Sequence, residues 1–136
     1  MNNFSFTVSK PLRYIAFSGW LVTIFWLSLV PAPPALETNI FGWDKLLHAA
    51  AYGCLTGIGG WALAGSAPLK RNSWAMIAGA AFSFGIIMEL LQKVCTETRT
   101  AEIWDLLANG VGAGVVLLGV LLVEAYKHRH SERDGN

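Results

Sequence analysis

The chain has 136 residues, enough for one domain, and 54% of them are hydrophobic while only 14% are charged. With a mean hydropathy of +0.45, this composition excludes an ordinary soluble domain and indicates a membrane protein. The net charge of +1, with no basic stripe along any segment, argues against nucleic acid as a partner.

Four apolar stretches follow one another along the chain. Each has about 17–18 residues, close to the length that crosses a hydrocarbon core of about 30 Å. They are Tyr14–Val30, Leu46–Leu63, Trp74–Leu91 and Leu106–Val123. The sequence therefore predicts an all-α fold, a four-transmembrane-helix bundle, in a single domain over residues 1–126. Residues 127–136, KHRHSERDGN, are polar and are predicted to form a disordered cytoplasmic tail.

Lysine and arginine are distributed unevenly between the two sides of such a bundle. Only Lys45, Lys93 and Arg99 fall in or beside the first and third connecting segments, at residues 31–45 and 92–105. The opposite side holds seven basic residues: Lys10, Arg13, Lys70, Arg71, Lys127, Arg129 and Arg133. By the positive-inside rule, we predict an N-in, C-in protein whose two termini are both cytoplasmic.

The second predicted helix begins with polar residues in the segment FGWDKLLHAAAYG. Asp44, His48 and Tyr52 are four residues apart and therefore share one side of a helix, with Lys45 beside them. Asp44 also suits the N-cap or the first turn, where its charge meets the positive end of the helix dipole. Ionisable groups inside a membrane segment cost a few kcal/mol each unless they are paired or hydrated, so they face the bundle interior.

The third and fourth predicted helices repeat this pattern at the same leaflet. Glu89 and Gln92, in MELLQ, are three residues apart near the end of the third helix. Asp105, Asn109 and Gly112 share one side at the start of the fourth helix, and Arg99 lies between the two helices. We therefore predict a single polar pocket that is open on the extracytoplasmic side.

Small residues at a spacing of four favour close helix packing. Gly53 and Gly57 form one GxxxG motif and Gly110 and Gly114 another, while Ala75, Gly79 and Ser83 follow the same spacing in the third helix. These faces can serve the internal bundle, a homo-oligomer or a partner membrane protein. The first helix has fewer small residues and is predicted to be the most exposed to lipid.

The set WDKLLHAAAYG, MELLQ, an arginine and IWDLLANGVGAG resembles the VanZ-like family, named for a teicoplanin-resistance accessory protein. The resemblance covers roughly residues 14–120, and Ser28 to Pro31 (SLVP) also look like the family. It implies a multi-pass protein of the bacterial cytoplasmic (inner) membrane, linked to the cell envelope and to glycopeptide antibiotic resistance. It implies no known reaction, and it suggests an envelope lipid or lipid-linked cell-wall precursor as the ligand class.

Two functions fit these residues. The first is binding or remodelling of a phosphate-bearing lipid, either a polyprenyl-linked precursor or a phospholipid. The ligand-binding residues would be Lys45, Tyr52, Gln92, Arg99, Asp105 and Asn109. The second is an intramembrane transferase or hydrolase, with His48 as general base or nucleophile, oriented by Asp44 or Glu89.

Structural roles remain open for the same residues. Asp44 can simply cap a helix, Lys45 can extend to lipid head groups, and Gln92 and Asn109 can hold helices together. A protein whose polar residues only lock the helices is therefore the third alternative. A metal site of His48, Glu89 and Asp105 is conceivable, but such a ligand set is common by chance. We accordingly predict no metal and no cofactor.

Overall fold

The computed structural model describes residues 8–30, 43–64, 68–96 and 102–134. Its four helices are α1 (Lys10–Leu29), α2 (Trp43–Leu63), α3 (Arg71–Cys95) and α4 (Ile103–Asp134). Each is long and apolar enough to cross a membrane. The prediction of an all-α, four-helix protein is confirmed, and the four helices indicate a multi-pass membrane protein.

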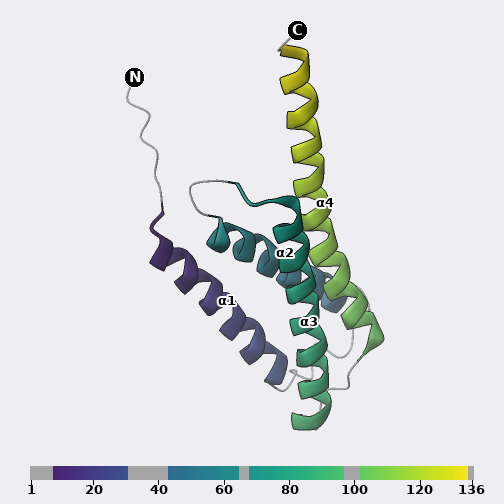
Figure 1. The fold of residues 1–136 in the computed structure, drawn as a ribbon. Helices are drawn as coiled ribbons and strands as arrows, with labels where there is room; N and C mark the ends of the chain where they lie inside the picture. Colours follow the sequence, from purple (N-terminus) through teal and green to yellow (C-terminus); the bar gives the residue numbers. More distant parts are fainter. Residues whose placement is uncertain (1–7, 31–42, 65–67, 97–101, 135–136) are drawn as a thin grey trace.

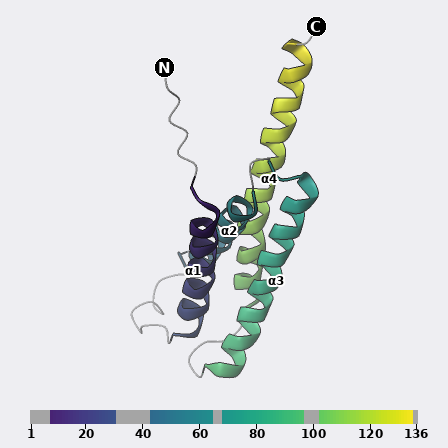
Figure 2. The same cartoon turned by 60° about the vertical axis from the view of Figure 1, so that its left-hand side comes forward.

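Successive helices run in opposite directions, so each end of the bundle contains two helix starts and two helix ends. The start of α1 and the end of α4 lie at the same end of the bundle (Figure 1). At the opposite end α1 and α3 finish, and α2 and α4 begin. We call this opposite end the cluster end, because the polar residues of α2, α3 and α4 lie there. Figure 2 shows that α4 extends well beyond the other three helices.

The length of α4 corrects one expectation. Residues 127–134 continue the helix to Asp134, whereas a disordered tail was predicted from residue 127. The segment after Gly119 has no glycine or proline before Gly135, so nothing in the sequence stops the helix. The rings of Tyr126 and His130, one turn apart, also contact each other in a tilted arrangement, with centroids 4.3 Å apart and an interplanar angle of 51°, which supports the continuation.

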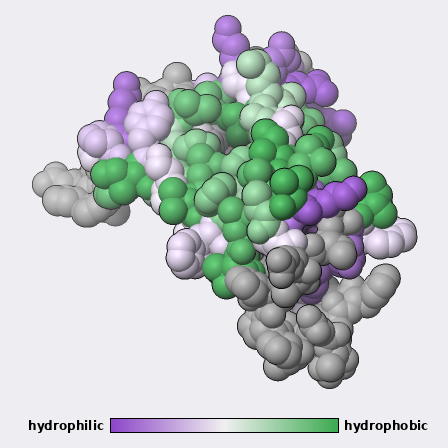
Figure 3. Space-filling model, turned by 90° about the horizontal axis from the view of Figure 1, so that it is seen from below, coloured by the Kyte–Doolittle hydropathy of each residue, from purple (hydrophilic) through white to green (hydrophobic). Residues whose placement is uncertain are grey.

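The outside of the bundle is apolar. Trp26, Met76 and Val94 each expose more than two thirds of their surface, and many other large hydrophobic residues are also exposed. Leaving such side chains in water would cost about 1.5–3 kcal/mol each, so this surface suits lipid. Hydrophobic residues cover much of the coloured surface at the cluster end as well (Figure 3). Among the four spans, α1 has the smallest buried share, in line with its predicted lipid exposure.

The closest helix approach joins α2 to α4. A Cβ atom added at Gly112 would collide with the backbone of Ala49, and one added at Gly53 would lie 3.2 Å from the Gly112 carbonyl oxygen. Neither Gly57 nor Gly114 has any neighbour within 4 Å of an added Cβ among the described residues. Each predicted GxxxG motif therefore has one packed glycine and one without a close neighbour: Gly53 packs against Gly112, and an added Cβ at Gly110 would lie 3.2 Å from the Phe82 ring. Figure 1 shows α2 crossing α4 obliquely, and the close backbone approach lies at Ala49, Gly53 and Gly112.

The other predicted small-residue face lacks a close contact at its glycine. An added Cβ at Gly79 meets nothing within 4 Å in the described part of the chain. Instead, Gly85 of α3 faces the cluster: its added Cβ would lie 3.1 Å from the Tyr52 ring and 2.9 Å from Asn109 Nδ2. The side of α3 that approaches α2 and α4 is thus the side that carries Gly85.

At the end opposite the cluster, Arg13 of α1 caps the carboxyl end of α2. Its guanidinium donates to the carbonyl oxygens of Ala64 and Trp61 and lies 5.6 Å from the Trp61 ring centroid. A cation at the carboxyl end of a helix satisfies carbonyls that have no partner within the helix and offsets the helix dipole. This contact fixes the beginning of α1 against the end of α2.

Candidate functional site

The first turns of α2 and α4 bring the polar residues together. Both helices begin at the cluster end, and their close approach at Ala49 and Gly112 places the preceding turns against each other. Because residues four apart share a helix face, His48 of α2 lies opposite Asp105 and Asn109 of α4. The predicted convergence of these two helices is therefore present in the structure.

Lys45 is surrounded by carboxylates. Its ammonium contacts Asp44 Oδ2 at 3.1 Å, Glu102 Oε2 at 2.9 Å and Asp105 Oδ1. The side chain of Lys45 is 20% exposed and that of Asp105 only 10%. An ammonium has three N–H donors, and these three acceptors account for all of them. Lys45 was predicted as a ligand-binding residue, and in the structure its ammonium faces carboxylates of the chain itself.

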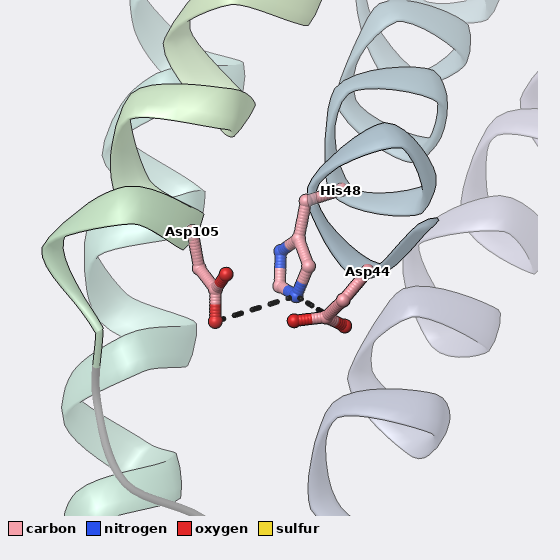
Figure 4. Close-up of side chains that lie close together, drawn as sticks. All are labelled: Asp44, His48 and Asp105. Carbon is pink, nitrogen blue, oxygen red and sulfur yellow. Dashed lines mark ion pairs between the residues drawn. The ribbon is translucent and has the colours of Figure 1, made fainter. Parts of the chain in front are cut away.

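His48 lies between Asn109 and two carboxylates. Its Nδ1 is 3.0 Å from Asn109 Oδ1. Its Nε2 is 3.9 Å from Asp44 Oδ1 and 3.8 Å from Asp105 Oδ2, and Figure 4 shows this nitrogen pointing between the two carboxylates. The nearest available ligand atoms of Asp44, His48 and Asp105 all lie within 4.8 Å of one another. These three residues, rather than the set with Glu89, could hold a metal ion.

The α3 residues form a second, buried layer. Glu89 Oε2 accepts a hydrogen bond from the backbone N–H of Glu102 at 3.3 Å. Gln92 Nε2 donates to the Ser28 carbonyl oxygen at 3.0 Å. Glu89 thus holds the start of α4, and Gln92 holds the end of α1. No hydrogen bond or ion pair joins Glu89 to His48 in the described part of the chain, so Asn109 orients the imidazole instead.

Tyr52 lies deeper in the same stripe and is buried. Its ring is 6.4 Å from the Phe84 ring, centroid to centroid, and it packs beside Gly85. Arg99, the remaining predicted ligand-binding residue, lies outside the described residues.

Sequence reasoning missed Glu102. It lies three residues before Asp105 and therefore approaches Lys45 from the same side of the chain. That i, i+3 spacing was the available signal. With Glu102 included, four carboxylates (Asp44, Glu89, Glu102 and Asp105) accompany one lysine among the described cluster residues. When ionised, this set attracts a cation more readily than an anion.

An apolar cavity lies deeper in the bundle, between α1, α2 and α3. It has a volume of about 240 Å³. Its lining residues are Phe17, Leu21, Leu55, Gly59, Leu63, Ile77, Ala80, Ala81 and Phe84. Phe84 joins the cavity to the cluster, because the same ring contacts Tyr52.

These features define the class of protein: a four-helix, multi-pass membrane protein with an acidic, partly buried polar cluster at one end. No protein-family model, curated protein or solved structure matches the chain. The geometry of the cluster is therefore the basis for any statement about function.

Proposed function

We propose that this chain binds or remodels a phosphate-bearing lipid in the outer leaflet of the bacterial inner membrane. The ligand is a polyprenyl-linked precursor or a phospholipid. The observation that carries the proposal is the position of the cluster: ionisable side chains from three helices converge at one end of an otherwise apolar bundle. In this proposal the protein is VanZ-like, as the motifs suggest, and its link to the cell envelope and glycopeptide resistance follows from that resemblance.

The distribution of basic residues supports an N-in, C-in arrangement with the cluster outside. The seven lysines and arginines of the opposite side lie at the starts of α1 and α3 and at the end of α4, away from the cluster. Positive residues are enriched on the cytoplasmic side of membrane proteins. Lys45 adds little positive charge on the cluster side, because its three carboxylate partners neutralise it.

The arrangement of polar and apolar surfaces suits an amphipathic ligand. The cluster offers carboxylate, imidazole and carboxamide groups near the membrane surface, and Tyr52 lies one turn deeper than His48. Below Tyr52, the apolar cavity of about 240 Å³ is large enough for part of an acyl or prenyl chain. A head group at the cluster and a tail beside α1, α2 and α3 would use both surfaces.

The acidic balance of the cluster sets a condition on this proposal. A phosphate would be repelled by the carboxylates unless positive charge accompanies it. Within the chain that charge would come from Arg99, which can bind phosphate through two hydrogen bonds, and from Lys93 in the last turn of α3.

Native mass spectrometry of the protein purified from bacterial membranes tests the proposal. We expect an anionic phosphate lipid to co-purify with the wild type and to be lost from Arg99→Ala. The matched control is Arg71→Ala, which removes the same charge at the other end of α3 and should leave the lipid bound. Equal lipid content in the wild type, Arg99→Ala and Arg71→Ala would contradict a specific site at the cluster.

An intramembrane transferase or hydrolase is the second candidate, favoured by one observation. His48 Nε2 faces Asp44 Oδ1 at 3.9 Å and Asp105 Oδ2 at 3.8 Å, and a histidine held beside carboxylates is a common general base. His48→Gln keeps a polar side chain of similar reach but cannot act as a base. Full complementation of an envelope phenotype by this variant would remove His48 from any reaction.

A further inference from the structure

The two aspartates of the cluster each use their two oxygens differently. Asp44 Oδ2 and Asp105 Oδ1 contact the Lys45 ammonium. The remaining oxygens, Asp44 Oδ1 and Asp105 Oδ2, both face His48 Nε2 (Figure 4). Lys45 therefore pairs with one oxygen of each carboxylate, and the other oxygen of each faces the same imidazole nitrogen.

The distances at this nitrogen do not fit hydrogen bonds. N–H···O bonds in proteins span about 2.7–3.2 Å, whereas the two distances here are 3.9 and 3.8 Å. They are closer to the separation of two ligand atoms that share one metal ion. With metal–ligand bonds of about 2.0–2.2 Å, neighbouring ligand atoms of a tetrahedral site lie about 3.4 Å apart. Small side-chain rotations would therefore bring the two oxygens and Nε2 to this separation.

Asn109 provides a separate observation that points to Nε2 as a ligand atom. This residue has no exposed surface, and its Oδ1 is 3.0 Å from His48 Nδ1. A carbonyl oxygen only accepts hydrogen bonds, so with the amide in this orientation Nδ1 carries a proton, and the neutral imidazole then presents the lone pair of Nε2 to the carboxylates. Metal-binding histidines are oriented in this way, with the other ring nitrogen donating to an oxygen.

A buried atom of the same side chain shows that this orientation has a cost. Asn109 Nδ2 is buried and has no hydrogen-bond partner among the described residues. Rotating the amide would pair Nδ2 with a bare Nδ1 and move the ring proton to Nε2, where both carboxylate oxygens lie beyond hydrogen-bond range. In the orientation present, an imidazole lone pair and two carboxylate oxygens face one another. That arrangement is repulsive unless a positive charge, either a proton on Nε2 or a bound metal ion, lies between them.

We infer that Asp44 Oδ1, His48 Nε2 and Asp105 Oδ2 bind a divalent transition-metal ion. One imidazole and two carboxylates suit Zn²⁺ or Mn²⁺, whereas Ca²⁺ and Mg²⁺ prefer oxygen ligands alone. Three protein ligands leave a coordination position open, on the side of Asp44, whose side chain is 53% exposed. A phosphate oxygen would fit that position, because the positive charge of the ion would offset the carboxylates of the cluster; this last step rests on the proposed function.

The metal site is tested without any lipid ligand. The full chain, purified without a polyhistidine tag and stripped with a chelator, is placed in nanodiscs of phosphatidylcholine and titrated with ZnCl₂ and MnCl₂ by calorimetry. We expect one ion per chain. Losing an outer-shell partner already weakens metal binding about 10–100-fold, so His48→Gln and Asp105→Asn should weaken it by at least about 100-fold.

The histidines at the end of α4 supply the control. The double variant His128→Gln/His130→Gln removes the other two histidines of the chain and should bind the ion as the wild type does. Far-UV circular dichroism verifies that each variant keeps its helices, and Asp105→Asn leaves Lys45 its other two carboxylates. No saturable binding, or binding lost only in the double variant, would overturn the site.

A second titration separates the ion from the lipid. Nanodiscs that contain phosphatidylglycerol are assayed for lipid retained by the protein, with and without the metal. Retention that requires the metal supports both proposals. Metal binding without lipid retention leaves the metal site standing and contradicts the proposed function, whereas metal-independent retention contradicts the role of the ion as the phosphate partner.

Discussion

Replacement of Gly112 by alanine tests the close approach of α2 and α4, on which the whole cluster depends. The added methyl group would collide with the backbone of Ala49, and a backbone cannot rotate away as a flexible side chain can. Overpacking of this kind costs about 1–3 kcal/mol. The variant should therefore separate the first turns of the two helices and lengthen the Lys45–Asp105 and His48–Asn109 contacts.

The magnitude is best measured as a difference between two glycines of α4. The methyl group added by Gly114→Ala would have no neighbour within 4 Å among the described residues. Both substitutions gain the same helix propensity, about 1 kcal/mol, so this contribution cancels. Gly112→Ala should then be less stable than Gly114→Ala by about 1–3 kcal/mol, the overpacking cost alone. Gly53→Ala, whose methyl group would lie 3.2 Å from a carbonyl oxygen, should fall between them.

Unfolding in mixed micelles with increasing sodium dodecyl sulfate, followed by far-UV circular dichroism, gives these free energies. The expected order of stability is Gly114→Ala, then Gly53→Ala, then Gly112→Ala. Equal stability of Gly112→Ala and Gly114→Ala would refute the reasoning, because it would mean that the α2 and α4 backbones do not meet at Gly112.

Three further predictions concern individual contacts. Lys45→Met leaves the mostly buried Asp105 without its cation, and should lower the free energy of unfolding by about 1–3 kcal/mol, between the values for exposed and buried pairs. Gln92→Leu removes the 3.0 Å hydrogen bond to the Ser28 carbonyl, and should cost about 0.6–1.7 kcal/mol in the same assay. In Cys54→Ser spheroplasts, a membrane-impermeant maleimide should label the exposed Cys95 at the end of α3, because the cluster end is proposed to face outward.

Each of these has a matched control at the opposite end of the bundle. Lys70→Met and Asn72→Leu change exposed residues at the start of α3, and each should shift stability by less than about 0.5 kcal/mol. If Lys45→Met were as harmless as Lys70→Met, the ion pairs of the cluster would contribute nothing to folding. Ser131→Cys, in a chain without Cys54 and Cys95, should be labelled only after permeabilisation; labelling of intact cells would reverse the proposed topology.

Much of the fold follows from local properties of the sequence. Hydropathy over about 18 residues depends on composition alone, so the four spans were predicted within a few residues of their observed ends, except at the end of α4. The meeting of His48 with Asp105 and Asn109 was predictable because residues four apart share a helix face. Both helices also had to begin at the same membrane surface.

What the sequence did not predict depends on how the helices cross. Whether Gly53 or Gly57 touches α4 is decided by the crossing position, and both belong to the same motif. The i, i+3 spacing of Glu102 and Asp105 indicates that both lie on one side, but their approach to Lys45 depends on how α2 and α4 cross, which spacing within one helix does not specify. Gln92 and Asn109 were open to structural or ligand-binding roles. In the structure Gln92 joins α3 to α1, while Asn109 contacts the imidazole.

The extension of α4 makes the cluster observable from a distance. A helix of 32 residues is about 48 Å long at about 1.5 Å per residue, so about 18 Å remains beyond a hydrocarbon core of about 30 Å. Asp105 and Asn109 occupy the base of this rod, and its far tip stands clear of the bilayer. If binding at the cluster tilts α4, the end of the helix near Asp134 moves further than the start. A spin label or fluorophore at that end would therefore detect the tilt as a displacement in the aqueous phase.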